Sequence, residues 1–471
     1  MWREGPAQAA AACRGQHVDA GSAACGVDRN TRAFDGNTRA FDRIARSVST
    51  ENARNATVTA FRRVDGELHA EGVSLSALAE RYGTPCYVYS RAALEDGFRS
   101  FSAAFDGVPH LVCYAVKANS NLAVLNILAR MGSGFDIVSG GELARVIAAG
   151  GDPAKIVFSG VGKTAVEMEA ALAAGIRCFN VESAAELETL DAIARGAGKI
   201  APISLRVNPD VDPKTHPYIA TGLKESKFGV AFEDALGLYR RAARLPGVAV
   251  HGIDCHIGSQ ITEIAACAEA AGKMFELVDR LEADGITLRH VDLGGGLGIR
   301  YHDEETIDPY AFALAVRQAR GARQHELLFE PGRFLVGNAG VLLTRVLYLK
   351  PGGERSFAIV DAAMNDLLRP ALYAAWHDVD AVRPRDVAAR RWDIVGPVCE
   401  SADFLARDRM LALGGGDLLA VRGAGAYGFA MSSNYNSRPR ACEVIVAGDR
   451  TYLARPREDA TDLFARESVL P

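Results

Sequence analysis

Residues 111–119 read LVCYAVKAN, and this stretch decides the fold. The run LVCYAV is apolar and rich in β-forming residues, which predicts a buried strand. The strand runs into Lys117, and the SNLAVLNILARM that follows from residue 120 predicts a helix. An ammonium group is costly to bury. Lys117 therefore either reaches solvent just beyond the strand, as most lysines do, or has a function that the rest of the chain should reveal.

The alternation of strand and helix that starts here continues to about residue 330. Helical stretches such as GELARVIAAG and TAVEMEAALAAG separate the strands, and several end in glycine, as helix C-caps do. Eight such units predict a (β/α)8 barrel of the TIM type, with a doubly wound open sheet as the alternative. The predicted strands are LVCYAV (from 111), GFDIV (134), KIVFS (155), IRCFNV (176), PISLRV (202), VAVHGIDC (248), TLRHVDL (287) and ELLFE (326).

The barrel is expected over residues 93–340, and the pattern changes on both sides of it. From 341 to 471, runs such as VLLTRVLYL, RWDIVG and CEVIVAG predict a mostly β domain. Residues 56–92 hold a hairpin signal at Asp65-Gly66 and a run PCYVYS, and we expect them to add strands to that domain. Residues 1–55 show little apolar periodicity and a tandem NTRAFDG-NTRAFD, which predicts a disordered extension.

Composition excludes several classes of function. A net charge of −5 gives no reason to expect a nucleic acid or an anionic membrane as partner. No apolar run is long enough to span a bilayer. The nine cysteines are scattered without a CxxC pair, which favours a reducing, cytoplasmic setting. We expect no metal site.

Polar or glycine-rich residues follow each of the eight predicted strands. Active sites of such barrels lie at the carboxyl ends of the strands. Because all eight strands end in this way, one shared site explains the pattern better than a set of unrelated helix caps. The residues are Lys117; Asp136 and Ser139; Ser159; Glu182; Arg206 and Asn208; His256; Gly294 to Gly298; and Glu330 with Arg333.

The last two loops indicate what the site binds. Loops after strands seven and eight of these barrels frequently hold phosphate, and here they contain GGGLG and EPGR. Glycine allows close approach of backbone amides to an anion, although a tight turn alone would also call for it. A strand-end lysine can form an imine with a carbonyl compound. Together these features predict pyridoxal 5′-phosphate, with Lys117 as its covalent anchor and Glu330 as the partner of its ring nitrogen.

A set of motifs then resembles a known family. In order, between about residues 60 and 460, they resemble those of the group IV pyridoxal-phosphate decarboxylases with the alanine-racemase fold, and most closely the diaminopimelate decarboxylases among them. The resemblance implies decarboxylation of meso-2,6-diaminopimelate to L-lysine, the last step of lysine biosynthesis, by a homodimer. The motifs are YAVKAN, FDIVSGGEL, RVNPDVD, TGLKESKFG, HIGSQI, DLGGGLGI, EPGR, GPVCESAD and SSNYNSRPR.

The resemblance also implies roles for single residues. His256 would stack on the cofactor ring, and Asp136 and Arg206 would support the lysine and the ring. Cys399 would be the proton donor, supplied by the second subunit. The phosphate would be held by Ser259, Gly294, Gly295, Gly296 and the EPGR loop with Gly332. The substrate would be bound by Arg333, Arg369, Tyr373, Glu400 and Tyr427, of which Arg333 and Tyr427 would also meet the cofactor.

Other functions on the same fold stay open at this point. An amino-acid racemase needs a tyrosine base and no CES motif, and a cofactor carrier would lack the β domain. Decarboxylases of the ornithine or arginine type have a Cys-Asp pair, whereas this chain has Cys399-Glu400. From composition alone, Cys399 would be a small buried hydrophobe; the adjoining Glu400 and the two arginines favour diaminopimelate.

Overall fold

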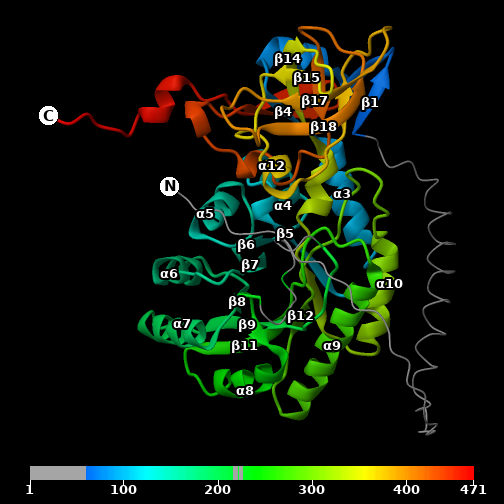
Figure 1. Ribbon diagram of the computed structural model, residues 1–471. Helices are drawn as coiled ribbons and strands as arrows, with labels where there is room; N and C mark the ends of the chain where they lie inside the picture. Colours follow the sequence, from blue (N-terminus) through cyan, green and yellow to red (C-terminus); the bar gives the residue numbers. More distant parts are fainter. Residues whose placement is uncertain (1–59, 216–220, 222–225) are drawn as a thin grey trace, which may run out of the picture. The chain divides into compact units, whose positions relative to one another are not determined.

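The structure, a computed structural model, describes residues 60–215, 221 and 226–471. The expectation for residues 1–55 and part of the TGLKESKFG motif lie outside this range. Within it, the predicted barrel is present, with helices outside a ring of strands (Figure 1). The barrel strands are β5 (His110–Ala115), β6 (Gly134–Ile137), β7 (Ile156–Phe158), β8 (Cys178–Val181), β9 (Ala201–Asn208), β11 (Val248–Asp254), β12 (His290–Asp292) and β13 (Glu326–Phe329).

The ring is closed and parallel throughout. Strand β8 pairs with β9, and β13 pairs with β5, so the sheet has no free edge. This closure confirms the barrel and excludes the doubly wound open sheet. A two-residue strand β10 (Val230–Ala231) pairs with the end of β9 and is not one of the eight strands that form the ring. The helices are α3 (Arg91–Ala103), α4 (Leu122–Arg130), α5 (Gly140–Ala148), α6 (Ala165–Ala174), α7 (Ala184–Gly196), α8 (Phe232–Ala242), α9 (Ile264–Ala283) and α10 (Pro309–Arg320).

The barrel interior changes from apolar to polar along the strands. Side chains two positions apart share a face of a strand. Ser159, Asn180 and Glu330, each two positions beyond a member of a small buried cluster, therefore point into the barrel above that cluster, where they contact one another. The cluster comprises Cys113, Val157, Cys178 and Leu328.

The second domain is mostly β, as predicted. Its main sheet has the order β18-β17-β15-β14-β4-β20-β21, and β19 pairs with β14 and β16. The short helix α11 (Arg333–Val336) lies on the chain between the barrel and these strands, and the short helix α12 (Arg369–Tyr373) lies between β15 and β16. The strands are β14 (Gly340–Lys350), β15 (Phe357–Val360), β16 (Val379–Ala381), β17 (Arg390–Val395), β18 (Phe404–Leu411), β19 (Leu418–Val421), β20 (Cys442–Ala447) and β21 (Arg450–Arg455).

Two of these strands were not predicted. Strand β16 has only three residues, too few for a pattern. Strand β18 reads FLARDRML, and its charged centre hides the alternation. The pairing with β17 shifts register here, and Asp408 has a φ of 56°. A bulged, charged strand is typical of the edge of a sheet, where β18 lies.

Only the last strand of the segment before the barrel joins the same sheet, and the strands before it form a separate three-stranded sheet. Asp65 and Gly66 both have positive φ and connect β1 (Phe61–Val64) to β2 (Glu67–Ala70) as a two-residue hairpin. After β3 (Val73–Ser74), helix α2 (Leu75–Tyr82) is capped by the side chain of Ser74. Strand β4 (Cys86–Ser90) then lies between β14 and β20. The domain boundaries at 56, 93 and 341 stay predictions. None of the helices described combines the length and hydropathy needed to cross a bilayer.

Candidate active site

Lys117 lies two residues beyond strand β5, in the short 3-10 turn η1 (Val116–Ala118). Its Nζ donates to Oδ2 of Asp136 over 2.6 Å, and the Asp136 side chain is fully buried in β6. Burial lowers the pKa of Lys117, but the carboxyl groups of Asp136 and Glu330 outweigh it and raise the pKa overall. The site therefore stabilises an ammonium ion, and Asp136 is positioned to accept the proton that a covalent bond at Nζ requires Lys117 to lose.

The segment around Lys117 is tied to the second domain. The backbone N–H of Tyr427 donates to the carbonyl of Ala118 over 2.8 Å, and Nδ2 of Asn119 donates to the carbonyl of Gly425 over 3.1 Å. Asn121, which caps helix α4, donates to buried Glu443 of β20 over 2.9 Å. These bonds hold the turn that carries Lys117, at the loop of residues 425–427 and at strand β20.

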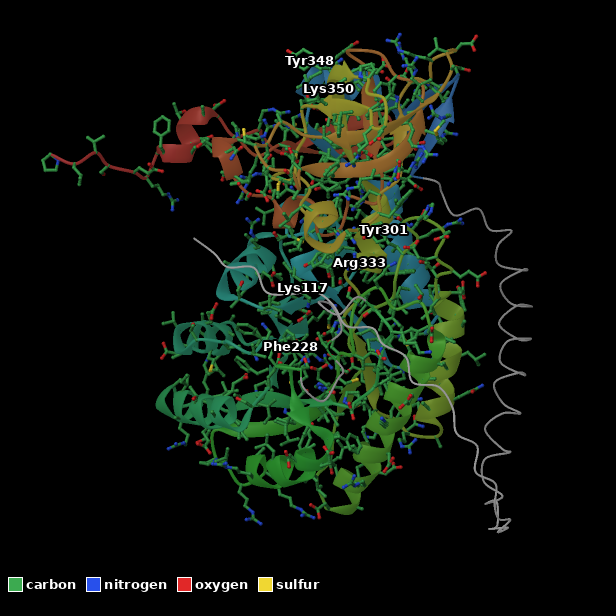
Figure 2. The ribbon with its side chains drawn as sticks, viewed as in Figure 1. Lys117, Phe228, Tyr301, Arg333, Tyr348 and Lys350 are labelled. Carbon is green, nitrogen blue, oxygen red and sulfur yellow. The ribbon has the colours of Figure 1, made fainter. Side chains whose placement is uncertain are left out.

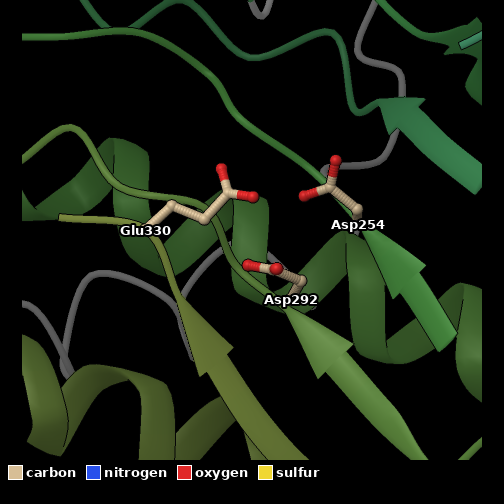
Figure 3. A group of neighbouring side chains, drawn as sticks. All are labelled: Asp254, Asp292 and Glu330. Atoms are coloured by element: carbon tan, nitrogen blue, oxygen red, sulfur yellow. The ribbon is translucent and has the colours of Figure 1, made fainter. Parts of the chain in front are cut away.

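Glu330 ends strand β13 inside the barrel. Its carboxylate accepts from Ser159 (3.3 Å) and Asn180 (3.2 Å). Figure 3 shows that it faces Asp254 and Asp292, and one oxygen from each of the three acids lies within 4.8 Å of the others. Burial, with the neighbouring acids, raises the pKa of Glu330 and of Asp254, and it raises the pKa of Asp292 to about 7. The raised pKa values reflect repulsion among the three acids, and a cationic or protonated ligand atom beside them would relieve that repulsion.

The three successive glycines after β12 are required by close contacts. A Cβ at Gly295 would lie 2.1 Å from the carbonyl oxygen of Glu330, and one at Gly294 would lie 2.4 Å from that of Cys255. Two of their amides already have partners: Gly294 donates to Asp292, and Gly295 donates to Nδ1 of His256 over 3.1 Å. The second bond leaves the proton of a neutral imidazole on Nε2. Burial, with Arg206 and Lys117 nearby, lowers the pKa of His256, so the ring is neutral.

Arg206 and Ser139 form hydrogen bonds that support the ends of the barrel strands and helices. Arg206 donates to Glu182 over 3.0 Å, and its guanidinium lies 4.8 Å from the ring centroid of Phe228. Glu182 also accepts from the backbone of Gly229. Ser139 caps helix α5 by accepting from Glu142, which is the ordinary structural role for a serine in that place.

Two arginines converge on Tyr301. Arg333 donates from Nη1 to the Tyr301 hydroxyl over 2.8 Å and from Nη2 to Ser259 over 3.0 Å. Arg369 lies with its guanidinium 4.3 Å from the Tyr301 ring centroid, and Arg333 lies 4.8 Å from that of Tyr427. Both arginines are buried, and in the described part of the chain neither forms a salt bridge. Figure 2 shows Lys117, Tyr301 and Arg333 gathered in one region.

Tyr373, at the end of α12, belongs to the same neighbourhood, because it acts on the pKa of both Arg333 and Arg369. Cys399 and Glu400 do not join this group. Cys399 is exposed, and its N–H donates to Asn436. Glu400 accepts from Tyr435 over 2.9 Å. Among the residues described, the hydrogen bonds of these two link them to the second domain and not to the Lys117 group.

The sequence prediction missed four residues of the site. Asp254 and Asp292 could have been found, because each is an acid within an apolar strand, where burial is costly. Tyr301 lies in an irregular loop and His377 follows α12, and neither position carries a sequence pattern that marks a site.

The charges and hydrogen-bonding groups of the residues in this site match those of pyridoxal phosphate. Buried atoms without a partner among the described residues include Oδ1 of Asp136, both carboxyl oxygens of Asp254 and Nε of Arg333. A protonated ring nitrogen suits the acids, and an anionic group suits the arginine. The lysine beside Asp136 is the only nucleophilic amine placed among these groups in the part of the chain that is described.

Comparison with known proteins decides the family. Residues 91–337 match the family described as "Pyridoxal-dependent decarboxylase, pyridoxal binding domain". The chain is 62% identical over 407 residues to the diaminopimelate decarboxylase of Pseudomonas aeruginosa, covering 86% of this chain and 98% of the relative. This chain belongs to the diaminopimelate decarboxylase family.

Further members of the diaminopimelate decarboxylase family agree with this assignment. The Vibrio cholerae enzyme is 60% identical over 86% of this chain and 98% of its own length. The Helicobacter pylori enzyme, solved in complex with L-lysine, superimposes with a TM-score of 0.81 at 44% identity, over 83% of this chain and 98% of that one. The M. jannaschii enzyme, also with L-lysine, gives a TM-score of 0.84 at 38% identity, over 88% and 99%. The chain is a decarboxylase that depends on pyridoxal phosphate.

Proposed function

We propose that this protein decarboxylates meso-2,6-diaminopimelate to L-lysine and CO2, the last step of lysine biosynthesis. Sequence relatives named diaminopimelate decarboxylase support the proposal. The H. pylori and M. jannaschii enzymes, which were solved with L-lysine, support it as well. The observation that carries it is the pair of buried arginines at Tyr301. Buried cations are normally paired, and a substrate with a carboxylate at each end brings the anion that Arg333 and Arg369 lack.

Bound pyridoxal phosphate supplies an electron sink for the electron pair that stays on carbon when CO2 leaves. Lys117 would hold the cofactor covalently, and Asp136 would take up the proton that Nζ loses. Glu330 would keep a proton on the ring nitrogen, and His256 would lie against the ring as a neutral imidazole. Arg206 acts at a distance, by holding Glu182 and the wall of the barrel.

The phosphate is bound by Ser259, Gly296 and the EPGR loop with Gly332. Gly294 and Gly295 make room for the phosphate and do not donate hydrogen bonds to it, because their N–H groups already have partners. Arg333 donates to Ser259 and to Tyr301 and so connects the phosphate end of the site to the substrate end.

The distal amino-acid head group is held by Arg333, Arg369 and Tyr373 at its carboxylate and by Glu400 at its ammonium group. Tyr427 closes the site beside Lys117. Cys399 delivers the proton to the carbon from which CO2 has left. Because Cys399 and Glu400 bond to the second domain of their own chain, we propose that they serve the site of a partner in a cytoplasmic homodimer.

The test supplies the purified protein and cofactor with meso-2,6-diaminopimelate, ornithine, arginine and single enantiomers of common amino acids in turn. We expect CO2 and L-lysine in equal amounts from diaminopimelate, and slower or no release from the others. Faster release from ornithine or arginine would assign a different substrate class. Racemisation without CO2 would overturn decarboxylation altogether.

A further inference from the structure

His377 follows helix α12, and its side chain is fully buried beside the arginine pair. Its Nε2 lies 2.8 Å from Nη1 of Arg369, and its Nδ1 lies 2.7 Å from the carbonyl oxygen of Arg422. A guanidinium only donates hydrogen bonds, and a carbonyl oxygen only accepts them. The two partners therefore fix one tautomer, with the proton on Nδ1 and the lone pair of Nε2 directed at Arg369.

Charge and burial keep this imidazole neutral. Burial and the adjacent Arg369 lower the pKa of His377 to about 3, against the opposing effect of the Arg422 carbonyl. Arg333 and Arg409 lower it further. An imidazolium would turn an N–H toward the guanidinium and lose the bond. The ring is thus an uncharged acceptor throughout the pH range in which proteins are usually active.

The ring also contacts the tyrosine that both arginines share. The rings of His377 and Tyr301 meet edge to face, with centroids 5.2 Å apart. His377 therefore fixes Arg369 from one side and supports Tyr301 from another. A buried carboxylate in this position would also hold Arg369, but it would neutralise the guanidinium and compete with an incoming anion.

We propose that His377 is a positioning residue that orients Arg369 for the distal carboxylate of the substrate. Because the imidazole is neutral, it does not neutralise the positive charge of Arg369. The inference rests on the proposed function of Arg369. It goes beyond that function because it assigns substrate discrimination to a residue that does not touch the substrate, and because it requires this residue to be a neutral acceptor.

The test compares two ligands that differ only in the carboxylate. L-Lysine carries it, and 1,5-diaminopentane lacks it. Their dissociation constants are measured on the cofactor-loaded protein and on the variants His377→Leu, His377→Gln and His377→Glu. Glutamine and glutamate have the same shape, and only glutamate brings a charge. Cofactor content and melting temperature are recorded for each variant.

We expect the wild type to prefer L-lysine. His377→Leu should reduce this preference roughly tenfold or more, the size of a lost hydrogen bond to a charged group. His377→Glu should reduce it by a similar factor, because its carboxylate would neutralise Arg369 and compete with the carboxylate of the ligand. His377→Gln should retain it within about threefold. Binding of 1,5-diaminopentane and the cofactor content should change little. In steady-state kinetics the losses should appear in KM for diaminopimelate more than in kcat.

The outcomes separate the two proposals. A wild type without preference for L-lysine would overturn the carboxylate anchor of the proposed function, and the role of His377 with it. A wild-type preference that survives in His377→Glu would overturn the role of His377 alone. Equal loss of both ligands in His377→Gln and His377→Glu would also overturn it, by showing a purely structural effect. If His377→Leu does not fold, the Gln and Glu pair alone decides.

Discussion

Lys117 experiences two opposing influences. Partial burial disfavours its charge, while Asp136 at 2.6 Å favours it more strongly. Burial in the barrel mouth alone would lower the pKa of Lys117, but the buried carboxylate of Asp136 reverses the sign of the shift. The proposed covalent chemistry at Nζ would require a proton transfer from Lys117, for which Asp136 is the adjacent acceptor.

Replacing Lys117 by alanine should abolish decarboxylation and remove the visible absorbance of the covalently held cofactor, because no other amine is placed among the acids described. Absorbance spectra of the reconstituted variant check this. The matched control is Lys155→Ala, which alters a partly buried lysine that precedes β7, at the opposite end of the barrel. An unchanged cofactor spectrum in Lys117→Ala would reject the assignment.

Asp292 provides a pH prediction. Its pKa is raised from 3.8 to about 7 in the folded chain, so between these values the folded state binds more protons than the unfolded state. Stability then falls as the pH rises through this window. Asp292→Asn cannot titrate and still accepts from Gly294. The cofactor-free variant should therefore lose less unfolding free energy than wild type between about pH 5 and about pH 8.

Denaturant unfolding at the two pH values measures this difference. Asp279→Asn is the control, because Asp279 is exposed and its pKa is lowered by Arg323. It should leave the pH dependence nearly unchanged. An equal loss in Asp292→Asn and in wild type would show that the acid is ionised in the folded chain at both pH values.

At the scale of elements, the sequence predicted regular structure better than the contacts between elements. All eight barrel strands were predicted because each is a short apolar run bounded by helical periodicity. Strands β16 and β18 were not, because one is too short and the other has charges at a bulge. The strand-end rule located Lys117 and Glu330, but no local pattern could bring Tyr301 from one loop to Arg369 on another element, since such contacts arise only in the folded chain.

The close packing of the glycine-rich turn after β12 can be tested by substitution. Gly295→Ala should weaken cofactor binding and lower the melting temperature, because its Cβ would lie 2.1 Å from the backbone oxygen of Glu330. Gly272→Ala is the control, in the middle of α9 with open space around the added Cβ. It should be neutral or stabilising by up to about 1 kcal/mol. Calorimetry and cofactor titration give both values, and an unaffected Gly295→Ala would mean that the turn adjusts freely.

At the scale of the whole molecule, the separation of Cys399 from the Lys117 group predicts complementation. Lys117→Ala and Cys399→Ala should each be inactive, but mixing them should restore activity, because in a mixed dimer one of two sites keeps both residues. With free exchange about half the dimers are mixed, which gives about a quarter of wild-type activity. A coupled assay for L-lysine measures it.

The control mixes Lys117→Ala with the double variant that carries both substitutions, since no site in that mixture is complete. It should remain inactive. If the first mixture also stays inactive after exchange of subunits has been verified, Cys399 acts on the site of its own chain or on none.

The bonds from Tyr427 and Gly425 to the Lys117 turn bear on how such an enzyme could be recombined. A chimaera that joined this barrel to another β domain at the strand boundaries alone would leave the carbonyl of Ala118 without its donor and the side-chain amide of Asn119 without its acceptor. Its lysine would then sit on a loose turn, however well the new sheet folded. Exchange of domains between relatives is therefore expected to succeed only where the donor carries matching backbone at residues 425–427, so that these three positions are inherited with the barrel they serve.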